Sequence, residues 1–245
     1  MTTSLYEKFH SRSRSSIKLI GSNNFTYRLI LGYLNKYLGT KKLEILDYGC
    51  GVGAIDLYLA SLGHEVVGLD ISKKAIITAA QSAKSLGLAD QAKFYDSTKM
   101  VKISKNQKFN LIICTEVIEH LEDDRGTVKK LIGLLKSSGI LFITTPSLNA
   151  PLYKLGLSKA FDARVGHLRR YDPEALASVI KDLGMHVEKV VKTEGIIRNA
   201  LFVNRSLGEL IRFVRGPISD AVTFVDDLTV PIFGESDIMV IARKP

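Results

Sequence analysis

The chain has 245 residues, of which 46% are hydrophobic and 24% charged, and its formal net charge is +9. This is the composition of a globular protein, and the length suffices for one domain around a large core. Its two cysteines, Cys50 and Cys114, are too few for a disulfide framework and favour a reducing, cytoplasmic location. Export and membrane insertion are disfavoured, because we find neither a secretory signal at the start nor an uncharged apolar stretch of about 20 residues.

Basic residues are concentrated at the start of the chain. Residues 1–42 contain eight Lys and Arg but a single Glu, whereas the remainder is nearly neutral. We therefore expect a basic N-terminal arm or lid, which could attract an acidic substrate, RNA or anionic lipid. A merely solvated basic surface is the simpler alternative.

Short β-branched apolar runs then alternate with helical patterns, as in a parallel sheet with crossover helices. Ser72 is placed to cap the second of these helices. The pattern predicts a doubly wound sheet, with strands at 43–48, 65–70, 92–95, 109–114 and 139–145 and helices at 54–61, 72–85 and 125–136.

The second half of the chain is less regular. Residues 146–170 show no helical or strand period, and a helix then begins at Pro173 and runs to about Leu183. A sixth strand is predicted near 187–191, and the apolar run DIMVIARK provides a last strand.

Residues 195–234 form an insertion between the sixth and last strands. Leu207, Leu210, Ile211 and Val214 recur in it at helical spacing, which predicts an amphipathic helix, and the following segment is also apolar. We expect the insertion to fold over the sheet edge as a lid that closes a pocket. Alternatively, its apolar surface guides a lipid-like substrate or touches a membrane.

The most informative motif is a glycine loop between the first strand and the first helix. Gly49, Gly51 and Gly53 follow Asp47 there, so the backbone can bend tightly against a ligand toward which the new helix points its free amides. Asp70 ends the second strand, where doubly wound folds place an acid that accepts hydrogen bonds from ribose hydroxyls. The loop therefore predicts a cofactor that contains adenosine.

Two cofactors suit this loop. Its spacing also satisfies the dinucleotide fingerprint, which would indicate NAD. Asp47, however, would face a pyrophosphate unfavourably but could pair with an ammonium group. S-adenosylmethionine carries an ammonium group and no phosphate, and we favour it.

With these motifs the sequence resembles the class I S-adenosylmethionine-dependent methyltransferases. The similarity runs from about residue 40 to 190 and includes the last strand. It rests on D-x-G-x-G-x-G at 47–53, on Asp70, on Asp96 after the third strand, and on CTEVIEHL after the fourth. In LLKSSGILFITTPS the family usually has a glycine pair where this chain has Ser138-Gly139.

The resemblance implies an α/β fold with a Rossmann-like, doubly wound sheet of seven strands, mostly parallel with the last strand antiparallel. It implies one methyltransferase domain, divided into the basic arm (1–42), the cofactor-binding core (43–194), the insertion (195–234) and the last strand (235–245). The implied reaction transfers a methyl group to an oxygen or nitrogen of a small-molecule or lipid-like acceptor. Peripheral membrane contact through the arm or the insertion would accompany a lipid-like acceptor, and nucleic acid is disfavoured as a partner.

The resemblance also assigns residues to the cofactor. Asp70 would bind the ribose, Asp96 would lie near the adenine amino group, and the turn at 114–116 would lie beside the methionine part. The complete expected set is Asp47, Gly49, Gly51, Gly53, Asp70, Ile71, Asp96, Thr115 and Glu116.

Two histidines are candidates for the reacting end. Methyl transfer needs a positioned acceptor, exclusion of water and, for a hydroxyl, removal of a proton. His120 and His167 follow the fourth and fifth strands, at the edge where open α/β sheets bind ligands. We expect one or both to act as the base. Nearby, Arg169, Arg170 and Tyr171 could face a substrate anion or anchor the loop.

The turn E-x-x-E-H raises the question of a metal. Glu116, Glu119 and His120 have the spacing of one helical face, and His167 could complete a set of ligands. The motif resembles metal-binding motifs of ubiquinone-pathway O-methyltransferases and of enzymes that methylate the 2′-hydroxyl at small-RNA 3′ ends. Similar turns are frequent in methyltransferases without a metal, so we predict none, with Glu116 lining the cofactor site and Glu119 facing solvent.

Three other functions use the same features. An NAD-dependent oxidoreductase would use the same glycine loop. An RNA methyltransferase is favoured by the basic arm, but no recognisable RNA-binding module accompanies the core. A non-catalytic protein at a membrane surface could keep the fold as a scaffold.

Overall fold

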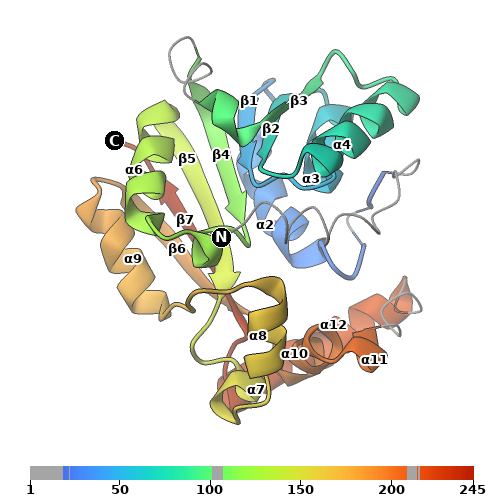
Figure 1. Ribbon diagram of the computed structural model, residues 1–245, viewed down its shortest axis with the longest axis vertical. Coiled ribbons are helices and arrows are strands. Elements are labelled where there is room, and N and C mark those ends of the chain that lie inside the picture. The colour runs from blue at the N-terminus through green and yellow to red at the C-terminus, as the bar shows by residue number, and fades with distance from the viewer. Residues whose placement is uncertain (1–18, 22, 101–106, 209–213, 215) are drawn as a thin grey trace.

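The computed structural model describes residues 19–21, 23–100, 107–208, 214 and 216–245, and Figure 1 shows how they are arranged. One sheet contains the strands β1 (Glu44–Tyr48), β2 (Glu65–Asp70), β3 (Ala92–Asp96), β4 (Phe109–Thr115), β5 (Leu135–Pro146), β6 (His186–Thr193) and β7 (Asp237–Arg243). The helices are α2 (Arg28–Leu38), α3 (Ala54–Ser61), α4 (Lys73–Ser85), α6 (Asp124–Leu134), α7 (Pro151–Lys154), α8 (Lys159–Val165), α9 (Pro173–Asp182), α10 (Ile196–Val203), α11 (Arg205–Gly208) and α12 (Pro217–Phe233), with 3-10 turns η1 (Ser97–Lys99) and η2 (Ile118–His120).

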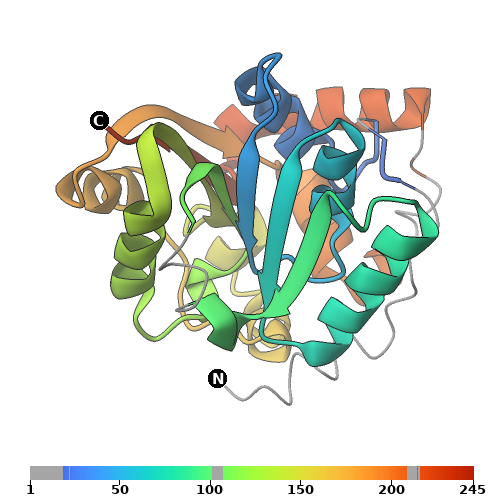
Figure 2. The same ribbon diagram turned by 90° about the horizontal axis from the view of Figure 1, so that it is seen from above.

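The strand order is β3-β2-β1-β4-β5-β7-β6, and helices cover both faces of the sheet (Figure 2). Strands β1 to β5 pair in parallel, whereas β7 is antiparallel to both of its neighbours. This confirms the predicted Rossmann-like sheet. Strand β1 lies between β2 and β4, so the strand order reverses there and opens a crevice at the carboxyl ends.

Local signals in the sequence account for the accuracy of the predicted elements. The hydroxyl of Ser72 accepts a hydrogen bond from the Ala75 amide at 3.2 Å, and so caps α4 as expected. The Asp172 carboxylate caps α9 in the same way, with Pro173 in the first turn. Predicted strands agree with the observed ones to within a few residues, apart from β5, which begins earlier, at Leu135.

The core consists of two apolar layers, one on each face of the sheet. Leu131 of α6 and Leu176 of α9 are buried on one face, and Leu31 and Leu34 of α2 are buried with α3 on the other. Helix α2 therefore belongs to the core, which differs from the prediction of an arm over residues 1–42. Leu, Ile and Tyr make up seven of its eleven residues and only Arg28 and Lys36 are charged, so the sequence carries an amphipathic pattern that the charge balance of residues 1–42 obscured. Residues 1–18 of the predicted arm lie outside the described residues.

Two other expectations change between β5 and β7. The stretch 146–170, expected to be irregular, contains the short helices α7 and α8, which span too few turns to give a period in the sequence. Helix α11 occupies the start of the predicted amphipathic helix, but Leu210 and Ile211 lie outside the described residues. The apolar segment after it forms α12, and Figure 1 shows α7, α8, α10 and α12 together beyond the carboxyl ends of β4 and β5.

A buried arginine joins this insertion to the rest of the protein. Arg198 of α10 is fully buried, and its guanidinium donates a 2.8 Å hydrogen bond to the carbonyl of Phe25, whose ring it also covers at 4.0 Å. Its charge is balanced by Glu194, at 3.4 Å, and by the buried Asp226 of α12, at 3.8 Å. The Asp226 carboxylate also accepts hydrogen bonds from three backbone amides at the start of α10. The insertion is thus fixed to the segment that precedes α2.

We expect Asp226→Ala to destabilise the protein by about 3 to 5 kcal/mol, because it removes a partner of a buried cation and uncaps α10. Urea unfolding followed by circular dichroism measures this. The neighbouring exposed Asp227 provides the control, since Asp227→Ala is expected to cost under about 0.5 kcal/mol. Equal effects of the two substitutions would contradict the role assigned to Asp226.

Candidate active site

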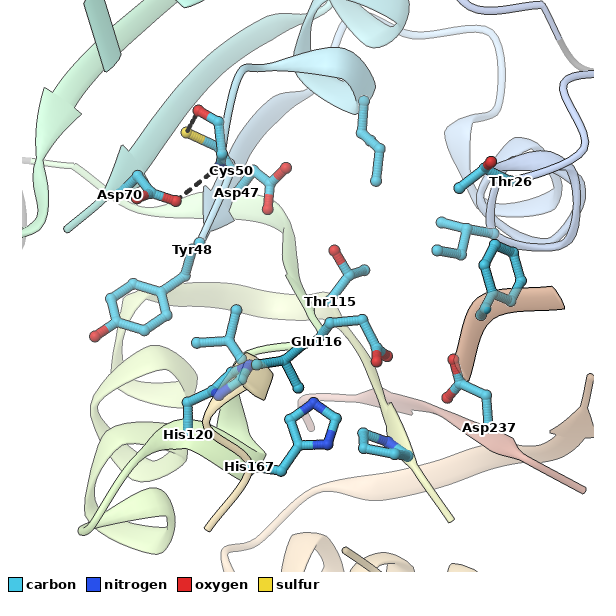
Figure 3. Close-up of a pocket in the computed structure, with 18 of the residues that line it drawn as sticks. Thr26, Asp47, Tyr48, Cys50, Asp70, Thr115, Glu116, His120, His167 and Asp237 are labelled. Carbon is cyan, nitrogen blue, oxygen red and sulfur yellow. Dashed lines mark hydrogen bonds between the residues drawn. The ribbon is translucent and has the colours of Figure 1, made fainter. Parts of the chain in front are cut away.

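A cavity of about 1000 Å³ opens at the carboxyl ends of the strands (Figure 3). Its walls come from the loops after β1 to β6, from the starts of α2, α3 and β7, and from α8 and α10. Most of the residues predicted for the site line this one cavity, namely Asp47, Gly49, Gly51, Asp70, Ile71, Thr115, Glu116, His120 and His167. Gly53 and Asp96 are not among the lining residues.

The glycine loop has the backbone that its sequence requires. Gly49, Gly51 and Gly53 have φ of 91°, 55° and 77°, in the left-handed region. A Cβ at Gly49 would lie 2.2 Å from the side chain of Val117, and one at Gly53 would lie 2.9 Å from the ring of Phe94. Gly53 therefore allows the loop to pack on β3, while Gly49 and Gly51 form the cavity wall.

The Asp70 carboxylate supports this loop from β2. One oxygen accepts a hydrogen bond from the Gly51 amide and the other from the Ser72 amide, both at 2.8 Å. Asp70 is buried but lines the cavity, and each carboxylate oxygen can accept a further hydrogen bond. The residue can therefore hold the loop and also accept hydrogen bonds from ligand hydroxyls.

Asp96 lies at the edge of the site. Its carboxylate accepts a hydrogen bond from the Thr98 amide at 2.9 Å, and this bond is the main cause of its lowered pKa. The adjacent Ser97 lines the cavity instead. The adenine role of Asp96 remains a prediction, and sequence analysis missed Ser97 because the motif draws attention to the charged neighbour.

Carboxyl groups line the wall between β4 and β7. Glu116 adopts a φ of 56°, which is rare outside glycine, and its carboxylate accepts a 2.8 Å hydrogen bond from Thr144. Figure 3 shows Glu116 and Asp237 on this side of the cavity. Burial, followed by the charges of Glu116 and Glu194, raises the pKa of Asp237 well above its ordinary value. Burial also raises the pKa of Glu194 to about 7. Asp237 and Glu194 had no motif to mark them.

His120 and His167 lie side by side, with ring centroids 4.9 Å apart. Between them lies Glu119, whose Oε1 is 3.6 Å from Nε2 of His120 and 4.0 Å from Nε2 of His167. The prediction that Glu119 faces solvent is wrong. The turn is 3-10, so Glu119 points inward, where it is fully buried and accepts a 2.9 Å hydrogen bond from Thr145.

Each histidine is oriented by its other ring nitrogen. Nδ1 of His120 lies 3.0 Å from the Gly166 carbonyl, which can only accept, so in the neutral ring Nε2 is the unprotonated nitrogen. Burial lowers the pKa of His120 and so favours the neutral ring. Nδ1 of His167 lies 3.0 Å from the Asp162 carboxylate. The two oxygens of that carboxylate also accept hydrogen bonds from Nε and Nη2 of Arg170.

The neighbouring basic residues anchor the loop. Arg169 pairs with Asp124 at 2.9 Å, and the Tyr171 hydroxyl donates to the same carboxylate at 2.5 Å. Arg170 pairs with Asp162 at 2.6 Å while lining the cavity. These contacts support the interpretation that the three residues anchor the loop.

A metal site is assembled only in part. Glu119, His120 and His167 each offer one ligand atom within 4.8 Å of the others, but Glu116, bonded to Thr144, does not join them in the described structure. The expectation of no metal remains a prediction.

Comparisons with known proteins agree with this architecture. A family model described as a methyltransferase domain matches residues 39–180. The ubiquinone biosynthesis O-methyltransferase of Glaesserella parasuis is 36% identical over 131 residues, which are 52% of this chain and 56% of that protein. The chain thus aligns with only about half the length of this curated relative.

Two solved structures show the same fold. The magnesium protoporphyrin IX methyltransferase of Synechocystis, solved with bound SAH, superposes with a TM-score of 0.61 at 18% identity, covering 90% of this chain and 82% of that one. A [4+2]-cyclase superposes with a TM-score of 0.63 at 17% identity, covering 89% and 80%. The fold alone therefore does not specify methyl transfer, but the family model covers more than half of the chain. The chain belongs to the methyltransferase-domain family.

Proposed function

We propose that this chain transfers a methyl group from S-adenosylmethionine to an oxygen of a small-molecule acceptor. The observation that carries the proposal is one cavity that joins the glycine loop and Asp70 to the pair His120 and His167. The relative from Glaesserella parasuis supports oxygen as the methylated atom, and nothing in the comparisons favours an NAD-dependent oxidoreductase, an RNA methyltransferase or a non-catalytic protein. We further propose the single domain and the cytoplasmic location expected from the sequence.

The residues present fit this cofactor. Oδ1 of Asp47 is buried at the cavity wall without a hydrogen-bond donor among the described residues, which suits a cationic ligand better than a pyrophosphate. Asp70 would hold the ribose, and Gly49 and Gly51 leave room for the ligand at the backbone. When bound, S-adenosylmethionine supplies a methyl group on a good leaving group.

The chain's own residues then position the acceptor and take its proton. The cavity includes the apolar side chains of Ile30, Phe161 and Phe202, which suit an apolar or aromatic acceptor and exclude water around it. Figure 3 shows His120 and His167 across the cavity from Asp47 and Cys50 of the glycine loop, and the two histidines would accept the proton of an acceptor hydroxyl.

A lipid-like acceptor and peripheral membrane contact are part of this proposal. Among the described residues, no helix is long and apolar enough to cross a bilayer. Helix α12 nevertheless exposes Phe224, Leu228 and Ile232, with fractional exposures of 66%, 56% and 72%. These side chains support contact between the insertion and an apolar surface.

We expect Asp70→Ala to weaken binding of S-adenosylhomocysteine about 10- to 100-fold, because a charged acceptor of hydrogen bonds from the ligand and the loop is lost. Isothermal titration calorimetry measures this. Asp90→Ala, at a fully exposed side chain, is expected to leave affinity unchanged. An Asp70→Ala protein that binds as tightly as the wild type would contradict the ribose role.

We expect His120→Ala and His167→Ala to keep affinity for S-adenosylhomocysteine within about threefold, but to lower turnover about 100-fold or more through loss of the base. Turnover is measured as S-adenosylhomocysteine formed from S-adenosylmethionine with a series of small phenols as probe acceptors. Losses of cofactor affinity as large as that of Asp70→Ala would show that the histidines hold the fold or the cofactor instead.

We expect turnover with the same phenols to survive dialysis against a chelator. Glu116 is hydrogen-bonded to Thr144, so it does not add a fourth ligand to the three possible ones, Glu119, His120 and His167. Elemental analysis of the dialysed protein checks that metal has been removed. Turnover that is lost on chelation and restored by Mg²⁺ or Mn²⁺ would establish a metal-dependent reaction.

A further inference from the structure

Asp56 is a buried carboxyl group that the proposed function does not use. It lies in the first turn of α3, beneath the glycine loop, and is fully buried. No backbone amide, hydroxyl or basic side chain among the described residues donates a hydrogen bond to either of its oxygens or to Oδ1 of Asp47, which is 1% exposed. Of the two carboxyl groups, only Asp47 lines the cavity.

The sequence makes room for this second carboxyl group at Gly68 of β2. A Cβ at Gly68 would lie 2.7 Å from Oδ1 of Asp56 and 2.8 Å from the sulfur of Cys50. No side chain could be accommodated there without displacing Asp56. The carboxyl group therefore occupies a fitted position between β2 and the glycine loop.

Asp47 and Asp56 lie within hydrogen-bonding distance, so one of them must carry a proton when they bond to each other. Burial raises the pKa of Asp56 well above its ordinary value, and the charge of Asp47 raises it further. Burial raises the pKa of Asp47 to about 7, even though a hydrogen bond from Asp56 lowers it. Asp56 is fully enclosed whereas Asp47 borders the cavity, so Asp56 is the group that keeps the proton and Asp47 the one that becomes the carboxylate facing the ligand.

Other titratable groups that face the pair add no positive charge. Tyr27, which precedes α2, and Cys50 of the glycine loop both have pKa values raised by burial, and the two carboxyl groups raise them further. Asp70 from β2 adds negative charge, and the buried thiol of Cys114 from β4 also faces Asp47. Among the described residues, neither Asp47 nor Asp56 forms an ion pair with Lys, Arg or His at the distances where such pairs form.

We propose that Asp56 is a positioning residue, which stays protonated and donates a hydrogen bond to Asp47. The cationic amino end of the cofactor then meets one oriented carboxylate, that of Asp47, and its binding expels a proton. This inference rests on the proposed function, because it requires S-adenosylmethionine or its product in the cavity. The proton leaves the Asp47 carboxyl group and passes to solvent, and the ammonium group replaces it as the positive partner. Two ionised carboxylates this close would not persist in a buried site.

Calorimetry with two ligands tests the proposal. S-adenosylhomocysteine carries the ammonium group, whereas 5′-methylthioadenosine has the same nucleoside and a thioether but no ammonium group. Titrations in buffers of different ionisation enthalpy count the protons released. Because the pKa of Asp47 is about 7, we expect S-adenosylhomocysteine to release close to one proton at about pH 6, decreasing by about pH 8, and its affinity to fall about tenfold per pH unit below 7. Methylthioadenosine should show neither effect.

Two variants of Asp56 distinguish loss of the donated hydrogen bond from loss of side-chain packing. Asp56→Asn keeps a hydrogen-bond donor of the same shape and should retain the wild-type pH profile. Asp56→Ala removes the donor, so the pKa of Asp47 rises, the pH midpoint moves upward, and affinity for S-adenosylhomocysteine near pH 7 falls about tenfold. Affinity for methylthioadenosine should stay constant in both variants. Asp90→Asn, on the surface, is the matched control.

Several results would overturn the proposal. These are binding of S-adenosylhomocysteine without proton release, equal losses in Asp56→Asn and Asp56→Ala, or equal losses for the two ligands. If Asp56→Ala does not fold, as judged by its thermal melt, the proton counts of the wild type and Asp56→Asn decide the matter. Failure of the wild type to bind S-adenosylhomocysteine at any pH would instead overturn the proposed function, and the inference with it.

Discussion

The structure depends on the position of β1 between β2 and β4. Parallel pairing on both sides of β1 brings the ends of three strands to one edge and separates the loops that follow them. The glycine loop, Asp70 and the turn at Glu116 all occupy that edge because of this pairing. Side chains far apart in the sequence therefore face one cavity without long loops to carry them, and the sheet fixes their relative positions before any ligand is present.

The two halves of the cavity are stabilised by different means. Backbone amides and tight glycine packing hold the half proposed to bind the cofactor, where Asp70 accepts a hydrogen bond from the loop that it supports. Buried charges hold the half proposed to bind the acceptor, through the Asp162–Arg170 pair beside His167 and through Arg198 in the insertion. Because removal of one partner leaves an uncompensated charge in the interior, which is strongly destabilising, this half of the cavity depends on complete networks.

Sequence patterns predicted the sheet, and the glycine loop predicted most of the cavity wall after β1 and β2. Both depend on local rules, namely strand and helix periods and the glycine backbone. Glu119 was misplaced because spacing alone does not distinguish a 3-10 turn from an α-helical one. Glu194 and Asp237 could not be found, because they reach the cavity only through the pairing of β6 and β7. Helix α2 was missed because the prediction for residues 1–42 rested on their net charge and not on the apolar period of residues 28–38.

The antiparallel pairing of β6 with β7 has a further consequence for the insertion between them. Thr193 and Asp237 are paired across the ladder, so the chain leaves the sheet and returns to it at neighbouring positions. A segment whose two ends are held together in this way can be exchanged or lengthened without disturbing the register of the sheet. A change within the insertion therefore alters one side of the cavity and leaves the strand ends that carry the glycine loop and Asp70 where they are.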